Sequence, residues 1–500
     1  MADFIRLSPE DNVVTATRPL EVGTVIEAVT AQAIIPRGHK VATSAIASGE
    51  VIRKYGQIIG YANGPIAPGE HLHTHNVAFR GTDQAYEFGT DLRPVTPATG
   101  DTFMGYRRKF GRAGTRNHIA VITSVNCSAT AARMIASAFG PEEMAAYPNV
   151  DGVTAFVHGT GCGMAGDGEG FEALQRVMWG YARHPNVAGV LMVGLGCEMN
   201  QIDWLLEAHG IEKGPLFHAM NIQDVAGLAK TVELGIAKVR AMLPLANDCT
   251  REECPASDLM VALQCGGSDA WSGMTANPAL GFACDLLAAQ GGTGVLGETP
   301  EIYGAEHLLT RRAARPEVGE KLIGMIRWWE DYTARNKGSM DNNPSPGNKK
   351  GGLTTILEKS LGAAAKGGTS PLNGVYKYAE RVTAPGFTFM DTPGYDPASV
   401  TGQIAGGCNL VTFTTGRGSA FGSKPAPTVK LATNSELARR MPDDMDIDGG
   451  RVLSEGASIE EVGREIYETL LRVASGEKTK SERQGLGDYE FVPWQIGAVM

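Results

Sequence analysis

The stretch IAVITSVNCSATAARMIASAF, residues 119–139, joins an apolar run to an amphipathic run, with a cysteine between them. Its first seven residues are rich in Ile and Val, which is typical of a buried β-strand. After Cys127 the apolar side chains recur at helical spacing. A buried strand that leads directly into a helix is the repeating unit of parallel α/β sheets. This stretch therefore predicts an α/β fold.

The same order of strand and helix recurs along the chain. The strand candidates are VTAFV (153–157), VAGVLMVG (187–194), DLMVALQ (258–264) and TGVLGE (293–298). Each precedes a segment with helical spacing, for example FEALQRVMWGYA after the first and NQIDWLLEAHG after the second. Strands that are apolar throughout are covered on both faces. We therefore expect a large region built on parallel sheets.

The first 80 residues have a different pattern. Short runs rich in β-formers are separated by turn sequences such as PRG and SGE, which predicts a small β-rich domain. The next stretch has no period and is rich in Gly, Pro and Thr, as linkers are. We divide the chain into four parts: a β domain (1–80), a linker (81–103), a first α/β catalytic domain (104–255) and a second one (256–500).

Composition limits the class of protein. The formal net charge of −10 argues against broad binding to nucleic acid or to anionic membrane. The sequence has no run of about 18 apolar residues and does not begin like a signal peptide, so we expect a cytoplasmic protein. Its eight cysteines are scattered along the chain, which favours reduced thiols that are free to bind metal.

Three of these cysteines follow predicted strands at equal intervals. Cys127, Cys162 and Cys197 are 35 residues apart, and each lies just past a strand. Cys265 and Glu298 follow two later strands in the same way. Ligands of open α/β sheets bind at the carboxyl ends of the strands. We therefore expect these side chains to share one edge, although a single buried cysteine is more often a small apolar residue.

The segment HGTGCGMAG, residues 158–166, contains a GxGxxG pattern after a strand. A dinucleotide site also needs an acidic residue about 20 positions further on, at the end of the next strand. Position 181 is Tyr, and Glu198 lies too far along. His158 and Cys162 suit a soft metal site better.

The segment GEHLHTHN, residues 69–76, places His71, His73 and His75 at alternate positions. On a regular strand neighbouring histidines would be about 6.6 Å apart and the outer two about 13 Å apart. One adjacent pair could then chelate an ion, but all three could not. Solvated decoration of an edge strand is the alternative interpretation.

Two polar segments complete the candidates. Arg116 and Asn117 adjoin the strand that leads to Cys127, which favours a structural role or a site role. The neighbouring Arg107, Arg108 and Lys109 fit a solvated turn. Residues 335–352 are polar and rich in Gly, Pro and Asn, which is typical either of a lid or of a plain surface loop.

Several of these segments together resemble the altronate and galactarate dehydratase family. They are GYRRKFGRAGTRN, VNCSAT, HGTGCG, GLGCEMNQ, LQCGGSDAWSGMTANPALG, ETPEIYGAEHLLTRR, DNNPSPGNKKGGLTTILEKSLG and MDTPGYDPASVTGQIAGGCNLVTFTTGRGS, and they cover nearly all of residues 104–425. The N-terminal region, with IPRGHKVA and GEHLHTHN, resembles the small SAF-type (β-clip-like) domain of such enzymes. Its histidine-rich end is more similar to the altronate branch, which favours a monoacid substrate.

The resemblance implies an iron-dependent lyase that converts a sugar acid, D-altronate above all, into a 2-keto-3-deoxy acid. The metal would be Fe²⁺, with Mn²⁺ as a second choice, on ligands drawn from Cys127, His158, Cys162, Cys197 and Cys265. In the expected mechanism, the ion stabilises the enediolate, a base takes the C2 proton and an acid helps the C3 hydroxyl to leave. The β domain would close over the strand ends. The catalytic candidates are His39, Lys40, His73, His75 and Glu298, and the substrate-binding candidates are Arg116, Asn117 and Arg417.

Other interpretations stay open at this point. Strand-end cysteines could instead hold a labile iron–sulfur cluster. The substrate could be galactarate, another aldarate or aldonate, or a sulfonated hydroxy acid that loses sulfite. A non-catalytic sugar-acid sensor is the alternative outside enzymes, but the sequence shows no helix-turn-helix output unit. We expect a small sugar acid as the binding partner, no nucleic acid or membrane, and a homodimer.

Overall fold

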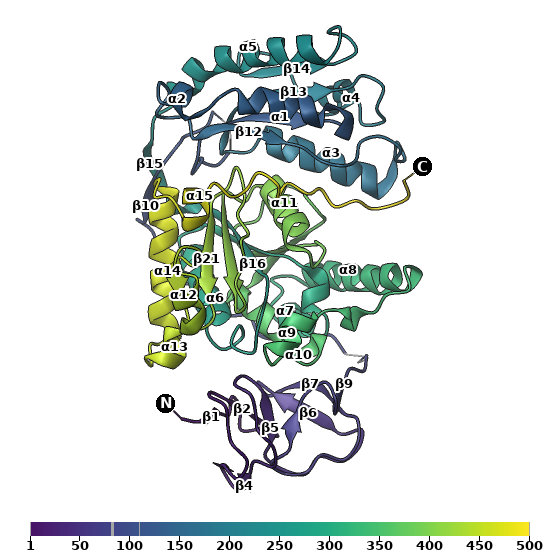
Figure 1. Ribbon diagram of the computed structural model, residues 1–500, viewed down its shortest axis with the longest axis vertical. Coiled ribbons are helices and arrows are strands. Elements are labelled where there is room, and N and C mark those ends of the chain that lie inside the picture. Colours follow the sequence, from purple (N-terminus) through teal and green to yellow (C-terminus); the bar gives the residue numbers. More distant parts are fainter. Residues whose placement is uncertain (1, 82–84, 110, 500) are drawn as a thin grey trace.

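The computed structural model describes residues 2–81, 85–109 and 111–499. Figure 1 shows three parts stacked along the long axis: the N-terminal β domain, a domain with the larger sheet, and a domain with the smaller sheet. Within these residues, no helix combines the length and the apolar character that a membrane span requires.

The β domain consists of short antiparallel strands, as the sequence predicts. Its four-stranded sheet has the order β1-β2-β5-β8. The strands are β1 (Phe4–Ile5), β2 (Val13–Ala16), β5 (Lys40–Ala42), β8 (His71–Leu72), the pair β3 (Val25–Ile26) and β4 (Val29–Thr30), and the sheet β6 (Val51–Lys54), β7 (Gln57–Ala62) and β9 (Val77–Ala78). Val14, Leu20 and Val41 contribute to its own small core.

The second domain is a parallel four-stranded sheet with helices on both faces. The strands β11 (His118–Thr123), β12 (Gly152–Phe156), β13 (Val187–Gly194) and β14 (Phe217–Asn221) have the order β12-β11-β13-β14. Ile122 on one face packs with α3 (Gly168–Ala182) and α4 (Ile202–His209). Val121 on the other face packs with α1 (Ala129–Ser137) and α5 (Leu228–Asn247). The short helices are η1 (Asn126–Ser128) and α2 (Pro141–Met144).

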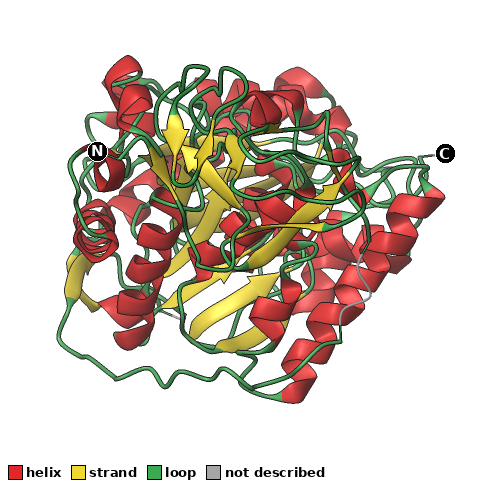
Figure 2. Cartoon of the chain, turned by 90° about the horizontal axis from the view of Figure 1, so that it is seen from below, coloured by secondary structure: helices red, strands yellow, loops and turns green. Residues whose placement is uncertain are grey.

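The third domain contains a parallel seven-stranded sheet, visible below the smaller sheet in Figure 1 and from below in Figure 2. Its order is β18 (Leu372–Tyr376), β19 (Gly386–Met390), β17 (Thr293–Leu296), β16 (Met260–Cys265), β20 (Leu410–Thr415), β21 (Thr428–Ala432) and β22 (Ile447–Asp448). The longer helices are α6 (Ala276–Ala289), α8 (Pro316–Arg335), α10 (Ile356–Ala364), α11 (Asp396–Gly406) and α14 (Ile459–Ala474). The short ones are α7 (Glu306–Thr310), α9 (Pro346–Lys350), α12 (Ser435–Arg440), α13 (Arg451–Ser454), α15 (Lys480–Arg483), η2 (Ala256–Asp258), η3 (Thr299–Ile302), η4 (Met340–Asn342) and η5 (Ala365–Gly367). The predicted α/β class is therefore confirmed.

A two-stranded ribbon marks where the chain enters and leaves the second domain. Strand β10 (Thr102–Gly105) pairs with β15 (Glu252–Pro255) in antiparallel register. Beyond the ribbon, helix α3 packs against α11 of the third domain, and the chain comes closest at Gly180. A Cβ atom at Gly180 would lie only 2.3 Å from the carbonyl oxygen of Ala405. The two α/β domains therefore meet in a close-packed contact.

Candidate functional site

The carboxyl edge of the seven-stranded sheet holds a buried cluster of charged side chains. Cys265 ends β16, Glu298 follows β17, and Lys366 lies in η5. The Nζ of Lys366 donates to Cys265 Sγ at 2.9 Å and to the Glu298 carboxylate at 3.3 Å. Among the described residues, Cys265, Glu298 and Glu301 form the one group of three possible ligand atoms within 4.8 Å of one another. Lys366 pairs with Glu298, and Lys359 pairs with Glu301 at 2.7 Å, so each carboxylate of the group has an ammonium counter-charge.

Glu298 is under strain and poorly satisfied. Its φ of 66° lies in the left-handed region, which a glutamate seldom adopts. The carboxylate is fully buried, and its Oε1 has no hydrogen-bond partner among the described residues. Burial and the neighbouring Glu301 raise the pKa of Glu298. Backbone strain of this kind is concentrated at functional sites, so Glu298 stays a candidate for a functional role.

The segment 335–352 lies over this cluster and is not a plain surface loop. Asn343 donates from Nδ2 to Glu301 at 2.6 Å, and Lys359 Nζ donates to the same carboxylate at 2.7 Å. Further along, the buried Asn348 donates to the backbone oxygen of Ser268 at 2.8 Å. Its asparagines therefore link it to the strand ends.

The β domain covers this edge through a buried ionic triad. Lys40 Nζ and Lys54 Nζ, both from the β domain, each lie 2.9 Å from the carboxylate of Glu358 in α10. All three side chains are almost fully buried. Burial lowers the pKa of Lys40 to about 8, and the two ammonium groups hold the pKa of Glu358 far below its usual range despite its burial. The triad carries one net positive charge within the interface.

Four histidines of the β domain gather beside Lys40. The Nδ1 of His39 lies 3.0 Å from the Nε2 of His71, and the rings of His39 and His73 are 4.6 Å apart. The ring of His75 lies 5.5 Å from that of His71. Burial is the main cause that lowers the pKa of His71 to about 4 and that of His73 to about 3, and the positive charge of Lys40 adds to it. The rings of His71 and His73 are therefore neutral at neutral pH and can act as ligands.

Comparison with known proteins agrees with this architecture. Residues 2–80 match the model for the altronate/galactarate dehydratase SAF domain, residues 105–247 the model for the second domain of D-galactarate dehydratase/altronate hydrolase, and residues 256–499 the model for the C-terminal domain of D-galactarate/altronate dehydratase. The chain is 37% identical to the altronate dehydratase of Bacillus subtilis (strain 168), over 97% of each chain. It is 36% identical to the altronate dehydratase of Escherichia coli (strain K12), over 96% of this chain and 97% of the relative. It is 38% identical to the galactarate dehydratase (L-threo-forming) of E. coli (strain K12), over 90% of this chain and 88% of the relative.

The chain belongs to the altronate/galactarate dehydratase family. It is a hydro-lyase, and dehydration of a sugar acid is its reaction class. Its β domain is the SAF domain of this family.

In this dehydratase the predicted cysteine set is divided between two sheets. Cys127, Cys162 and Cys197 are exposed, on three loops at the carboxyl edge of the four-stranded sheet. These loops touch, since Asn126 N–H donates to the Thr160 oxygen at 3.0 Å and Asn200 N–H donates to the Gly161 oxygen at 3.1 Å. The three thiols therefore share an edge. Cys265 belongs to the other sheet, so one ion on all four sulfur atoms does not fit this fold.

His158 does not fit the role of metal ligand that the sequence predicts. Its ring is buried, with Nε2 2.9 Å from the oxygen of Thr123. Its Nδ1 accepts a hydrogen bond from the N–H of Thr160 at 3.3 Å. Neither nitrogen is left for an ion. The side chain joins strand β11 to the loop after β12.

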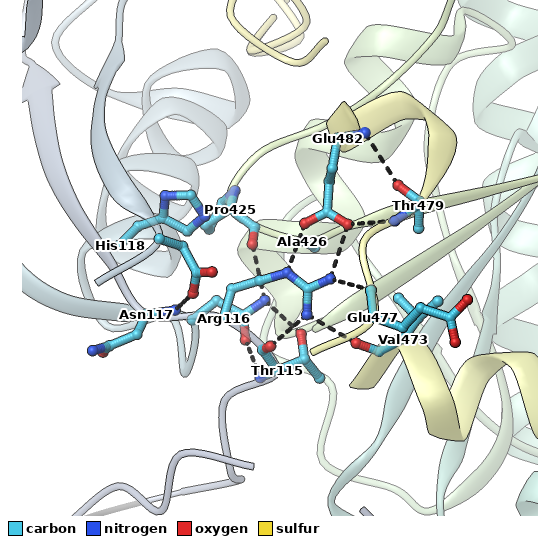
Figure 3. A network of polar contacts seen from close by, with 12 residues as sticks. Thr115, Arg116, Asn117, His118, Pro425, Ala426, Val473, Glu477, Thr479 and Glu482 are labelled. Atoms are coloured by element: carbon cyan, nitrogen blue, oxygen red, sulfur yellow. Dashed lines mark hydrogen bonds and ion pairs between the residues drawn. The ribbon is translucent and has the colours of Figure 1, made fainter. Parts of the chain in front are cut away.

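Arg116 and Asn117 are not placed to bind substrate. Figure 3 shows the guanidinium of Arg116 enclosed by Glu482 and by carbonyl groups. The carbonyl acceptors are those of Thr115, Val473 and Glu477. The side-chain amide of Asn117 donates hydrogen bonds to two backbone carbonyls. Both residues precede β11, at the end of the sheet opposite the loops that carry the thiols.

Arg417 remains close to the covered edge. It follows β20, its side chain is exposed, and its N–H donates to the oxygen of Gly267 at 2.9 Å. Cys408, in contrast, precedes β20 at the opposite end of the strand and is fully buried.

The sequence did not identify several residues that define the site. Lys54, Glu358 and Lys366 gave no signal, because their partners are distant in the chain. The sequence analysis named His71 in the histidine cluster but did not include it among the catalytic candidates, because it assumed a regular strand. Strand β8 ends at Leu72, and the chain turns over residues 73–76, which brings the rings together.

Proposed function

We propose that this dehydratase removes water from D-altronate to give a 2-keto-3-deoxy acid, with the help of a divalent metal ion, Fe²⁺ or Mn²⁺. The observation that carries the proposal is the 3.0 Å separation of His39 Nδ1 and His71 Nε2. Two ligands at right angles, each about 2.1 Å from one ion, lie about 3.0 Å apart. The two most nearly full-length relatives described above are altronate dehydratases, which supports altronate as substrate.

The histidine pair fits a catalytic ion better than the other donor sets. Among the described residues, no third His, Cys, Asp or Glu ligand atom lies within 4.8 Å of both nitrogens. A site with few protein ligands leaves positions for the carboxylate and the 2-hydroxyl of a substrate, as catalytic metal sites do. Bound there, the ion would supply Lewis acidity to the developing enediolate.

His73, His75 and Lys40, which lie beside the His39–His71 pair, have separate tasks in the proposed reaction. His75, on the exposed side, takes the proton from C2 and returns it to the C3 hydroxyl, which leaves as water. The resulting enol then tautomerises to the 2-keto-3-deoxy acid. The buried Nδ1 of His73 has no partner among the described residues and accepts a hydrogen bond from a substrate hydroxyl. Lys40 does not reach the substrate. Its positive charge, held by Glu358, adds to the effect of burial in keeping His71 and His73 neutral.

A substrate screen tests the proposal. The protein, purified without oxygen and supplied with Fe²⁺ or Mn²⁺, is incubated with D-altronate, other aldonates, galactarate and sulfolactate, and the 2-keto acid and sulfite are measured. We expect the highest kcat/KM with altronate and no activity after chelation. Preference for galactarate or release of sulfite would contradict the substrate, and full activity in chelator would contradict the metal. Visible absorbance together with stoichiometric sulfide would indicate an iron–sulfur cluster instead.

A further inference from the structure

A cavity of about 510 Å³ lies between the second and third domains, away from both carboxyl edges. Its walls include Val187 at the start of β13, Met260 at the start of β16 and Gly406 at the end of α11. Ligand pockets in proteins commonly have volumes of about 300–1,000 Å³. The cavity thus has the size of a ligand site at the amino ends of the strands.

Four arginines line this cavity: Arg108, Arg112, Arg183 and Arg381. No Asp or Glu appears among the lining residues within the described part of the chain. The chain as a whole has a net charge of −10, so this concentration of positive charge runs against its composition. A concave surface lined by one sign of charge attracts ligands of the opposite sign.

Two of the arginines are fixed by the protein itself. Arg108 donates to the oxygen of Pro185 at 2.6 Å and to Asn117 Oδ1 at 2.9 Å. Arg112 donates to the oxygen of Ser257 at 2.6 Å and to the Thr293 hydroxyl at 3.0 Å. Their guanidinium groups thus contribute a fixed positive potential, while most of their donors are occupied.

The other two arginines have free donors. Arg183 and Arg381 are exposed, and neither makes an ion pair or a side-chain hydrogen bond to any residue that the structure describes. Arg183 lies over the ring of Trp179 at 5.7 Å, and its position after the C-terminus of α3 gives it a structural role as well. Arg381 has no such role. Its neighbour Glu380 already pairs with Lys321 at 3.6 Å.

We propose that this cavity binds a small multivalent oxyanion, carrying phosphate or several carboxylates, between Arg183 and Arg381. The planar fork of arginine matches both groups with two parallel hydrogen bonds. Arg183 belongs to the second domain and Arg381 to the third. The bound anion therefore bridges the two domains at a distance from the proposed catalytic histidines.

Isothermal titration calorimetry of the full-length protein with pyrophosphate and with citrate tests this site. The double variant R183Q/R381Q removes the two free guanidinium groups. The matched control is R133Q/R439Q, which removes two exposed arginines elsewhere, one of them stacked on Tyr489 at 5.3 Å. We expect at least one probe to bind the wild type with a submillimolar Kd that rises with salt. The double variant should weaken binding at least about ten-fold, and the control should leave it unchanged.

The two probes separate the sources of the anion. Binding of pyrophosphate alone supports a phosphorylated ligand, binding of citrate alone a polycarboxylate, and binding of both the shared chemistry. Absence of binding by either probe below about 10 mM contradicts the site. Equal affinity of the double variant and the control also contradicts it. An H71A variant guards against binding in the histidine cluster, because loss of affinity there would place the anion in the wrong site.

Discussion

The two parallel sheets of this dehydratase present carboxyl edges of opposite character. The edge of the four-stranded sheet carries three exposed thiols on touching loops. The edge of the seven-stranded sheet is covered by the SAF domain and holds buried lysines, carboxylates and Cys265. The same topology thus produces an open edge and a closed one. Whether the side chains at a strand end are exposed or buried depends on whether another domain covers that edge, and the order of the strands does not show which edge is covered.

The third domain is also held by two different kinds of contact. On the side of the SAF domain, charges are embedded in an apolar cluster in which Ile59 packs with Leu361. On the side of the second domain, α3 and α11 meet at Gly180. The first contact depends on charge pairing and the second on close packing, so the two should fail under different substitutions.

The largest effect is expected from Glu358→Gln. This substitution leaves Lys40 and Lys54 buried without a counter-charge, and breaking a buried pair in this way costs about 3–5 kcal/mol. Urea unfolding measures the loss. The matched control is Glu436→Gln, which breaks the exposed pair with Arg37 and should cost no more than about 1 kcal/mol. Similar losses in both variants would mean that the triad does not hold the SAF domain.

The second contact should respond to an added methyl group. Gly180→Ala places a Cβ 2.3 Å from the Ala405 oxygen, and such overpacking costs about 1–3 kcal/mol. Gly324→Ala, in helix α8, meets no atom within 4 Å and should stabilise the protein by up to about 1 kcal/mol through helix propensity. Thermal unfolding of both variants compares the signs. A neutral Gly180→Ala would show that the domains are not closely packed there.

A smaller effect is expected at acidic pH from His184, which lies beside the same contact. Burial lowers its pKa to about 3, and its Nε2 lies 3.0 Å from the oxygen of Cys408. Burial keeps the His184 ring neutral in the folded protein, whereas an unfolded histidine takes up a proton below its ordinary pKa of about 6.5. The folded state therefore loses stability relative to the unfolded state as the pH falls below that value. Wild type should lose about 1 kcal/mol more than His184→Asn between pH 7 and pH 5.5.

Urea unfolding at the two pH values gives this difference. His75→Asn, at an exposed histidine, serves as control and should lose as much as the wild type. If His184→Asn behaves like the control, the buried ring is protonated without penalty and the argument from burial fails.

The fold followed from local pattern, whereas only part of the site did. Apolar runs such as residues 187–194 are buried strands wherever they occur, so the α/β class could be predicted. The shared edge of Cys127, Cys162 and Cys197 followed from the same rule. The substrate-binding role expected for Arg116 was wrong, because the local sequence is the same whether an arginine next to a strand contacts substrate or pairs with Glu482. The triad of Lys40, Lys54 and Glu358 joins residues about 300 positions apart, which no local pattern encodes.

The central claim is that the covered edge, with its histidines, holds the catalytic metal and that the open edge does not. Metal content and turnover of His71→Ala, compared with a Cys127→Ser/Cys162→Ser/Cys197→Ser triple variant, test it most directly. The claim predicts that His71→Ala loses the bound metal and at least about 100-fold in kcat, while the triple variant keeps both. Loss of metal and turnover in the triple variant, with His71→Ala unaffected, would contradict it.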